Sequence, residues 1–311
     1  MSDPLSEVVT LLRPRTVFSK RISGAGPWGV RYTEFGHPSF CAVLEGRCLL
    51  RVEGHDAVTL EAGDFVLLPT TPGFTMTGFE AVRRPPALDP KAAPSAVAEV
   101  HHGARDRDPD VRLLGGYFIL DSPDPALLST LLPTLVHVRG AERLALLVRL
   151  VGEESRERKP GCDLVLARLV EVLLVEALRA TPGEEAPPGL LRGLADARLA
   201  PALRQMHAQV ARAWSVAELA AAAALSRSTF FARFTRTVGL PPMEYLLAWR
   251  MALAKDLLRQ QGVALTEVAE RIGYSSASTF STAFARHVGQ PPGRYARERR
   301  ATAAPSIASV G

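Results

Sequence analysis

The last third of the chain repeats apolar residues with the period of an α-helix. Positions i, i+3, i+4 and i+7 of one predicted helix are all apolar, namely Leu265, Val268, Ala269 and Ile272. Gly273 follows them, and glycine readily adopts the left-handed conformation that ends a helix. Ser275 or Ser276 can then cap a second helix, which buries Phe280 and Phe284. Two helices joined by a short turn that contains glycine predict a helix-turn-helix unit.

The same pattern occurs fifty residues earlier, so the chain holds two copies of one helical unit. The matching letters are Ser228-Thr229-Phe230, Phe234, Val238-Gly239, Pro241-Pro242 and Tyr245 in the first copy, and Ser278-Thr279-Phe280, Phe284, Val288-Gly289, Pro291-Pro292 and Tyr295 in the second. Upstream of these letters the spacing shortens by one residue, which indicates a one-residue insertion in the second copy. Residues 242–260 carry a continuous apolar stripe, which predicts one long helix that holds the two units rigidly apart.

Short strands separated by turn residues are predicted in the first 120 residues. Two hairpins are indicated, with turns at 45–47 and 61–64. Residues 1–20 predict a short helix and a lead-in, residues 81–112 a Pro- and charge-rich excursion between strands, and residues 113–120 a returning strand. Several short strands at this spacing predict a small barrel or sandwich.

Three helices are predicted next, over 126–138, 141–159 and 163–180. The third has a broad apolar stripe at helical spacing, made of Leu166, Leu169, Val170, Leu173, Leu174, Ala177 and Leu178. This stripe suits a dimer surface and packing against the barrel equally well. A Pro- and Gly-rich stretch from 181 to 189 predicts a linker, and residues 301–311 predict a frayed tail.

Charge is distributed unevenly along the 311 residues. Residues 200–300 hold 14 Lys and Arg against 6 Asp and Glu, a net charge of +8, whereas residues 1–199 hold 23 against 26, a net charge of −3. DNA phosphates would need positive charge in the repeat, although arginine-rich helices are also often only solvated faces. The N-terminus lacks the apolar region of a secretory signal, and no apolar run is long enough to span a bilayer. Three cysteines at no metal-ligand spacing suit a reducing cytoplasm.

Residues of the repeat that do not face the core predict a surface that contacts DNA. They are mostly small, hydroxyl-bearing or basic, and comprise Arg227, Ser228, Phe231, Ala232, Thr235, Arg236, Ser276, Ala277, Ser278, Ser281, Thr282 and Arg286. Small and hydroxyl-bearing side chains let a helix approach base edges, and arginines at helix ends suit phosphates. Phe231 suits either an apolar base contact or a local packing cluster. The two exposed faces differ, which predicts unlike half-sites about 10 base pairs apart.

Residues 201–300 resemble the DNA-binding domain of the AraC/XylS family of bacterial transcription regulators. The similarity lies in Ser215-Val216-x-x-Leu219-Ala220, Leu225-Ser226-x-x-x-Phe230-x-x-x-Phe234, Val238-Gly239-x-x-Pro242-x-x-Tyr245-Leu246, Trp249-Arg250-Met251-x-x-Ala254, Val268-Ala269-x-x-Ile272-Gly273-Tyr274, Phe280-x-x-x-Phe284 and Gly289-x-x-Pro292-x-x-Tyr295. The resemblance implies double-stranded DNA and RNA polymerase as partners. The chain departs from the pattern at Ala232, where relatives often carry a long polar or basic residue.

The first 120 residues resemble the cupin-type sensor domain of some members of that family. The similar stretches are Asp3-Pro4-Leu5-Ser6-x-Val8, Gly26-Pro27-Trp28-Gly29, Phe40-x-x-Val43-Leu44-Glu45-Gly46 and Leu60-x-x-Gly63-Asp64-x-Val66-Leu67-Leu68-Pro69. Cupin enzymes hold a metal with His and Glu side chains, but Cys41 and Phe74 stand where relatives often have His. His101 and His102 lie in the predicted excursion. We therefore expect no catalytic residues, no metal and no cofactor.

Cys41 and Cys48 are the candidate sensor residues. Some relatives sense oxidants or electrophiles through cysteine, whereas the simpler interpretation is that both thiols are small buried hydrophobes. Cys162 begins a predicted helix, where its pKa could be lowered, or it could be inert.

These observations predict an α+β fold of two domains. Residues 1–180 form a cupin-like β-barrel with trailing helices, residues 181–199 a linker, residues 200–300 an all-α double helix-turn-helix domain, and residues 301–311 a flexible tail. The predicted function is a sequence-specific DNA-binding transcription regulator, not an enzyme, controlled by a small molecule or a redox signal. A homodimer is expected, although the N-terminal half could serve dimerisation alone. The alternative is a cupin-type metalloenzyme with an accessory helical domain, which would need bound metal in the N-terminal half.

Overall fold

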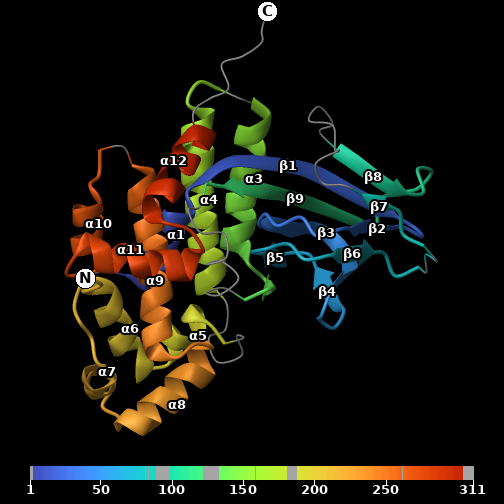
Figure 1. The fold of residues 1–311 in the computed structure, drawn as a ribbon. Coiled ribbons are helices and arrows are strands. Elements are labelled where there is room, and N and C mark those ends of the chain that lie inside the picture. The colour runs from blue at the N-terminus through green and yellow to red at the C-terminus, as the bar shows by residue number, and fades with distance from the viewer. Residues whose placement is uncertain are drawn as a thin grey trace, which may run out of the picture. The chain divides into compact units, whose positions relative to one another are not determined.

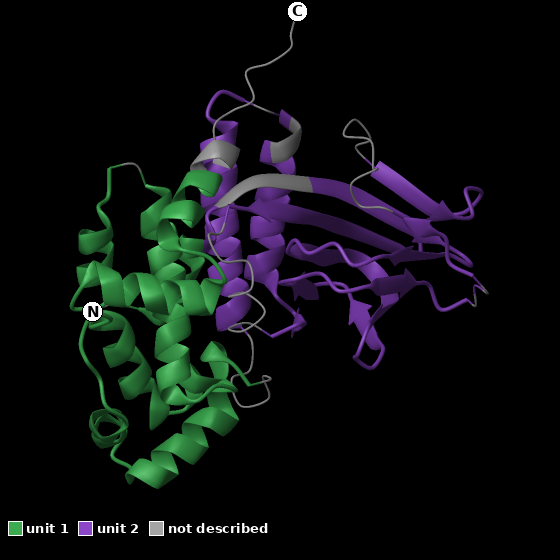
Figure 2. Cartoon of the chain, in the orientation of Figure 1, with its two compact units in different colours: residues 1–11, 122–127, 188–311 green, residues 12–121, 128–187 purple. Residues whose placement is uncertain are grey.

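The computed structural model describes residues 3–80, 82, 84–88, 99–121, 133–157, 159–180, 188–260 and 262–303. The chain divides into two compact units (Figures 1 and 2). The helical unit contains residues 1–11, 122–127 and 188–311, and the barrel unit contains residues 12–121 and 128–187. Of the predicted linker, residues 181–187 lie outside the described residues, so the predicted domain boundary stays a prediction.

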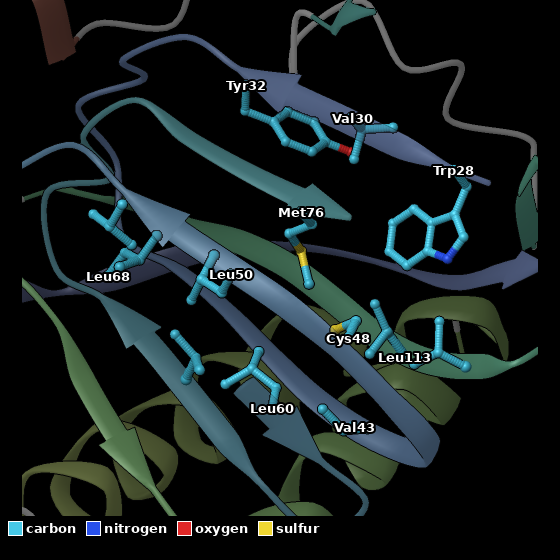
Figure 3. Close-up of a cluster of buried hydrophobic side chains, with 13 residues drawn as sticks. Trp28, Val30, Tyr32, Val43, Cys48, Leu50, Leu60, Leu68, Met76 and Leu113 are labelled. Carbon is cyan, nitrogen blue, oxygen red and sulfur yellow. The ribbon is translucent and has the colours of Figure 1, made fainter. Parts of the chain in front are cut away.

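The barrel unit is built on a curled sheet, which has ten strands within the described residues. The strands are β1 (Pro14–Ala25), β2 (Gly29–Tyr32), β3 (Ser39–Val52), β4 (Val58–Glu61), β5 (Phe65–Leu68), β6 (Phe74–Thr77), β7 (Ala87–Leu88), β8 (Glu99–Gly103), β9 (Val111–Leu120) and β10 (Val136–Val138). Neighbours along the main path run β7-β2-β6-β3-β9-β1-β8, while β4 and β5 pair with β3, and β10 pairs with β5. Apolar side chains from several strands meet inside the sheet, as Figure 3 shows.

Strand β3 curls this sheet because it is long and pairs with different strands along its two halves. Its first half pairs with β5 and β9, and its second half pairs with β4 and β6. The register against β9 shifts between Val43 and Glu45, and Gly46 follows with φ of 74°. A Cβ on Gly46 would overlap the carbonyl oxygen of Asp110, so glycine is required there. The hairpin predicted with a turn at 45–47 is therefore wrong, because these residues continue one strand, β3, directly after a bulge between Val43 and Glu45.

Three further predictions for the barrel unit are wrong. The turn at 61–64 does not close a hairpin, because β4 and β5 each pair with β3 and not with each other. Residues 136–138 form strand β10 instead of the end of a helix, and residues 126–132 of that predicted helix lie outside the described residues. The excursion predicted over 81–112 contains β7 and β8, and β8 pairs in parallel with β1.

Strand β1 occupies most of what the sequence presents as a lead-in. Its inward positions include Lys20, which lines a cavity, and Gly24, which lies against Trp28. Neither residue is a large apolar one, so the alternation of apolar and polar positions that marks a strand is interrupted on both sides of Ile22.

Helices α3 (Glu142–Glu157) and α4 (Cys162–Arg179) lie side by side and contact β1 (Figure 1). The apolar stripe of α4 is buried within the barrel unit through Leu166, Val170, Leu173, Leu174, Ala177 and Leu178. Packing against the barrel therefore accounts for this stripe, and a dimer surface is not needed to explain it. Other faces of the two helices leave large apolar side chains exposed, namely Leu146, Leu150, Leu164, Val165 and Val172.

The helical unit consists of α1 (Pro4–Leu12), α5 (Leu190–Ala195), α6 (Leu199–Ala208), α7 (Val216–Ala222), α8 (Arg227–Val238), α9 (Pro242–Arg259), α10 (Leu265–Arg271), α11 (Ala277–Val288) and α12 (Pro292–Ala303). Helices α7 and α8 form one helix-turn-helix, α10 and α11 form the other, and α9 is the predicted long connecting helix (Figure 1). Across the part of the chain that is described, no helix combines the length and apolarity needed to cross a bilayer.

Each helix-turn-helix is held by the same trio of aromatic residues. Phe234 lies 5.5 Å from Phe230 and 5.8 Å from Tyr245 between ring centroids, and Phe284 lies 5.5 Å from Phe280 and 5.6 Å from Tyr295. All six rings are buried. Aromatic rings at these separations attract one another through their edges and faces as well as by burial. The shared letters of the repeat are therefore the core of each copy.

The turns of the two copies differ in length and in backbone chemistry. Five residues separate Arg271 from Ala277, whereas four separate Ala222 from Arg227, which confirms the one-residue insertion in the second copy. The left-handed position is Gly273 in the second turn, with φ of 85°, and Ala224 in the first, with φ of 52°.

A hydrogen-bonded chain ties α1 into the helical unit. His207 on α6 is buried, with its Nδ1 2.7 Å from Glu7 Oε2 and its Nε2 2.7 Å from the Tyr245 hydroxyl. A carboxylate only accepts hydrogen bonds, so His207 donates from Nδ1 to Glu7, while its Nε2 meets the Tyr245 hydroxyl. Burial, and then the charge of Glu7, raise the pKa of Tyr245 and keep its hydroxyl protonated. The imidazole also lies over Trp249, with ring centroids 4.5 Å apart.

Candidate nucleic-acid interface and barrel cavity

The second helix of each helix-turn-helix begins and ends in the same way. Ser226 precedes α8 and accepts a hydrogen bond from the backbone N–H of Thr229, and Ser276 does the same for Thr279 at the start of α11. Both helices end at a left-handed glycine, Gly239 or Gly289. The sequence allowed either Ser275 or Ser276 as the cap of this helix, and the structure shows that Ser276 is the cap. One acceptor site of the Ser276 hydroxyl is therefore already used.

The outer face of α8 is formed by predicted DNA-contacting residues. Arg227, Ser228, Ala232 and Arg236 are exposed, and Thr235 is half-buried. Phe231 is 44% exposed, and its ring lies outside the Phe230–Phe234–Tyr245 trio. The face therefore presents an aromatic ring and a methyl group between basic ends.

The outer face of α11 is smaller and more polar. Ser278, Thr282 and Arg286 are exposed, while Ala277 and Ser281 are half-buried. The hydroxyls of Ser281 and Thr282 donate to the carbonyl oxygens of Ala277 and Ser278, at 2.7 and 3.1 Å. Bonding of this kind leaves the oxygen lone pairs free to accept, so both side chains can still meet donors on base edges.

Two other arginines of this region serve the fold. Arg233 Nε donates to Asp196 at 2.7 Å, and Arg250 donates to the carbonyl oxygens of Val210 and Arg212 at 2.9 and 2.7 Å. These partners could not be predicted from the sequence, because they lie 37 to 40 positions away from the arginines along the chain. Within the described residues, Arg227, Arg236 and Arg286 are exposed and form no ion pair.

A cavity of about 80 Å³ lies inside the barrel unit. Its polar side chains are Lys20, Tyr32, Ser39, Cys41, Thr71 and Tyr117, and the rest of its wall is mostly apolar. A single water needs roughly 10–15 Å³, so the cavity has room for a small organic molecule. Burial lowers the pKa of Lys20, whose Nζ lies 5.9 Å from the centroid of the Tyr32 ring. Burial, and then the neighbouring Cys41, raise the pKa of Tyr32 to about 12.

Comparison with known proteins agrees with both halves of this architecture. A family model described as Cupin matches residues 3–181, and one described as a helix-turn-helix domain matches residues 219–298. A putative AraC-like transcription regulator of Streptomyces lividans is 38% identical over 290 residues, which span 89% of this chain and 92% of that protein. The chain belongs to the AraC-like transcription regulators.

A second putative AraC-like transcription regulator, from Streptomyces antibioticus, is 37% identical over 289 residues, or 89% of this chain and 92% of that protein. Among solved structures, the DNA-binding domain of AdpA in complex with a target DNA is 31% identical. The match covers 33% of this chain and 94% of the AdpA chain, with a TM-score of 0.32. The predicted family, the two-domain α+β fold and the function as a DNA-binding transcription regulator are confirmed.

In this AraC-like chain the two candidate sensor thiols differ in position. Cys41 is half-buried at the cavity wall, and Cys48 is buried in the apolar cluster of Figure 3. Burial raises the pKa of both thiols, that of Cys48 to about 12, with a smaller contribution from a neighbouring group in each case. Both thiols are therefore protonated at neutral pH, where a thiol is a poor nucleophile. Their role as sensors stays a prediction.

The histidines near the barrel of this AraC-like chain have partners other than metal. His101 and His102 lie on strand β8 rather than in a loop. His101 lies 3.0 Å from Ser23 Oγ through Nδ1 and 2.6 Å from the Ala104 carbonyl oxygen through Nε2. His102 stacks on Trp28, with ring centroids 6.3 Å apart. Over the described residues, three or more His, Cys, Asp or Glu nowhere form a group that could hold a metal ion.

Proposed function

We propose that α8 and α11 enter two successive major-groove segments and read unlike half-sites. The observation that carries this proposal is the contrast between core and surface in the repeat. Each copy has the same aromatic trio and the same caps. On the outer faces, however, Phe231 and Ala232 of α8 stand where α11 has Ser281 and Thr282. Similar scaffolds with different surfaces favour an asymmetric DNA site over a palindrome.

The predicted contact residues divide into two roles. Arg227, Arg236 and Arg286 bind phosphates and fix the register of the protein on DNA. Phe231 offers an apolar contact to a thymine methyl group, and Thr282 offers both a methyl group and a hydroxyl oxygen to base edges. The half-buried Ala277, Thr235 and Ser281 let the backbone of each helix approach the groove closely.

A gel-shift titration on the DNA upstream of the chain's own gene tests this assignment. Arg286→Ala should weaken binding to all sequences alike and reduce the slope of affinity against salt by about 1. Phe231→Ala should change base preference in one half-site alone, by about 1–3 kcal/mol. Arg51→Ala removes the same charge from an exposed position of β3 in the barrel unit and serves as the matched control. Native binding no tighter than to random DNA would overturn the proposal.

We further propose that an effector at the barrel cavity controls DNA affinity. The cavity supports a small molecule, and Cys41 at its wall supports an oxidant as the alternative signal. Small organic acids, alcohols and amines should be screened for a change in DNA affinity of the full chain, beside hydrogen peroxide. A response to peroxide that Cys41→Ala abolishes would favour redox control. A response to small molecules that survives in Cys41→Ala would favour the cavity as a ligand site.

The proposed assembly is a homodimer that recruits RNA polymerase in the bacterial cytoplasm. Exposed apolar side chains on α3 and α4 support a second copy as partner, and Leu164 is the most exposed of them at 64%. Leu164→Glu should convert a dimer to a monomer in sedimentation at micromolar concentration. A native chain that sediments as a monomer there would contradict the dimer.

A further inference from the structure

Strand pairing places four cavity residues in one row across the sheet. Lys20 pairs with Gly115, and Gly115 pairs on its other side with Cys41. Cys41 in turn pairs with Val66. Residues paired directly across strands project from the same face, and all four line the cavity. Gly115 has no side chain, so the row contains a gap between the amine of Lys20 and the thiol of Cys41. A Cβ at Gly115 would lie 3.3 Å from Ile22 Cδ1 and would partly fill this gap.

The Lys20 ammonium is the unbalanced charge of this cavity. Within the described residues, the lining contains no Asp or Glu, and Lys20 forms no ion pair. Its Nζ lies 5.9 Å from the centroid of the Tyr32 ring. Burial lowers the pKa of Lys20, as expected for a cation that loses water without gaining a carboxylate. A half-buried amine of this kind is stabilised by any ligand that brings a negative charge.

Two of the four hydroxyls at the cavity wall, those of Ser39 and Thr71, are already occupied. The Thr71 hydroxyl donates to the carbonyl oxygen of His37 and lies 2.8 Å from Ser39 Oγ. These groups therefore satisfy one another, whereas Lys20 is left with three N–H donors. A ligand with one acidic group and an otherwise apolar body matches the wall better than a polyhydroxylated one would.

We propose that the cavity binds a short apolar carboxylate, whose charged group pairs with Lys20 and whose hydrocarbon lies over Gly115 against the apolar wall. This inference rests on the proposed control of DNA affinity from the barrel, and names the chemical class of the effector. The volume of about 80 Å³ has room for a ligand with a few carbon atoms beyond its carboxylate.

Calorimetry on the full chain with butyrate, butan-1-ol and butylammonium tests the proposal. Butyrate should bind about 10–100-fold more tightly than butan-1-ol, the ratio expected of one charge-assisted hydrogen bond. Butylammonium should not bind. Affinity should rise about fourfold per methylene from propionate upward and stop rising once the cavity is full. Butan-1-ol binding as tightly as butyrate would overturn the proposal.

Lys20→Met keeps an unbranched side chain and removes the charge, so it should abolish the preference for butyrate and leave butan-1-ol binding unchanged. Arg21→Met removes the same charge from the next residue, which is exposed on the opposite face of β1, and should leave butyrate binding as it was. Gly115→Ala should weaken all ligands, because its methyl group enters the gap. A Lys20→Met chain that still prefers butyrate would refute the pairing.

A gel shift with the same ligands tests the ligand class of the cavity separately from the proposed control of DNA affinity by the barrel. Butyrate that binds in calorimetry without changing DNA affinity would contradict control from the barrel and support the ligand class. DNA affinity that responds to butan-1-ol and not to butyrate would support control from the barrel and overturn the ligand class.

Discussion

The left-handed turn residues of the two repeats, Ala224 and Gly273, predict opposite effects on stability. A residue with a Cβ in the left-handed conformation destabilises the folded state by about 1–2 kcal/mol. Replacing it by glycine removes this strain, but it also raises the entropy of the unfolded chain, which lowers stability by about 0.4–1 kcal/mol. Because Ala224 has a φ of 52°, Ala224→Gly should stabilise the helical unit by about 0.5–1 kcal/mol. Gly273→Ala gains the same strain and a Cβ that overlaps the Ala211 carbonyl oxygen, so it should destabilise by at least about 2 kcal/mol.

Thermal unfolding of the full chain measures both changes, since about 1 kcal/mol shifts Tm by about 4 °C in a unit of this size. Hydrogen exchange read on peptides of α7–α8 and α10–α11 then shows which copy is affected. Ala232→Gly is the matched control, because Ala232 lies within α8, where glycine costs about 0.5–1 kcal/mol. The reasoning from φ would be refuted if Ala224→Gly destabilised as Ala232→Gly does, or if Gly273→Ala left Tm unchanged.

Three further predictions concern buried or half-buried polar groups. Tyr245→Phe leaves Nε2 of buried His207 without its partner, so it should lower the free energy of unfolding in urea by about 1–3 kcal/mol. The control Tyr274→Phe removes a half-exposed hydroxyl and should lower it little. Cys48, with a pKa of about 12, should resist iodoacetamide at pH 8 until urea unfolds the chain, and equal rates in both states would contradict its burial. The pKa of Asp196 is lowered because hydrogen bonds from Arg233 and two backbone N–H groups outweigh its burial, so its contribution to stability exists above pH 3.8 and is lost as pH falls through the folded pKa. Asp196→Asn should therefore flatten the acid side of a plot of stability against pH, and an unchanged acid side would count against this ion pair.

Most of the helical unit could be predicted because its signals are local. Ser226 and Gly239 lie at the two ends of α8, and each acts on backbone groups within one turn of itself. The aromatic trio is likewise marked by spacing alone, since Phe230 and Phe234 are four residues apart on one face. Exposed faces follow from the same period, which is why the predicted DNA-contacting residues emerge on the outside of α8 and α11.

The barrel unit could be predicted only in outline because its contacts connect distant parts of the chain. Gly46 has the sequence surroundings of a turn, yet it lies within β3, where the carbonyl oxygen of Asp110, far along the chain, leaves no room for a Cβ. Lys20 has the appearance of a surface residue, and only its pairing with Gly115 places it at the cavity. For the same reason Arg233 could not be assigned to Asp196 from its position on α8.

The bond between Glu7 and His207 also sets an order of events during synthesis. These residues are 200 positions apart, and ribosomes add about 5–20 residues per second, so α1 waits about 10–40 seconds for its partner to emerge. During that interval the apolar side of α1, which includes Val8 and Val9, has no completed surface to cover it. Helix α1 is thus made long before α6, and it can take its hydrogen-bonded place in the helical unit only after α6 has emerged.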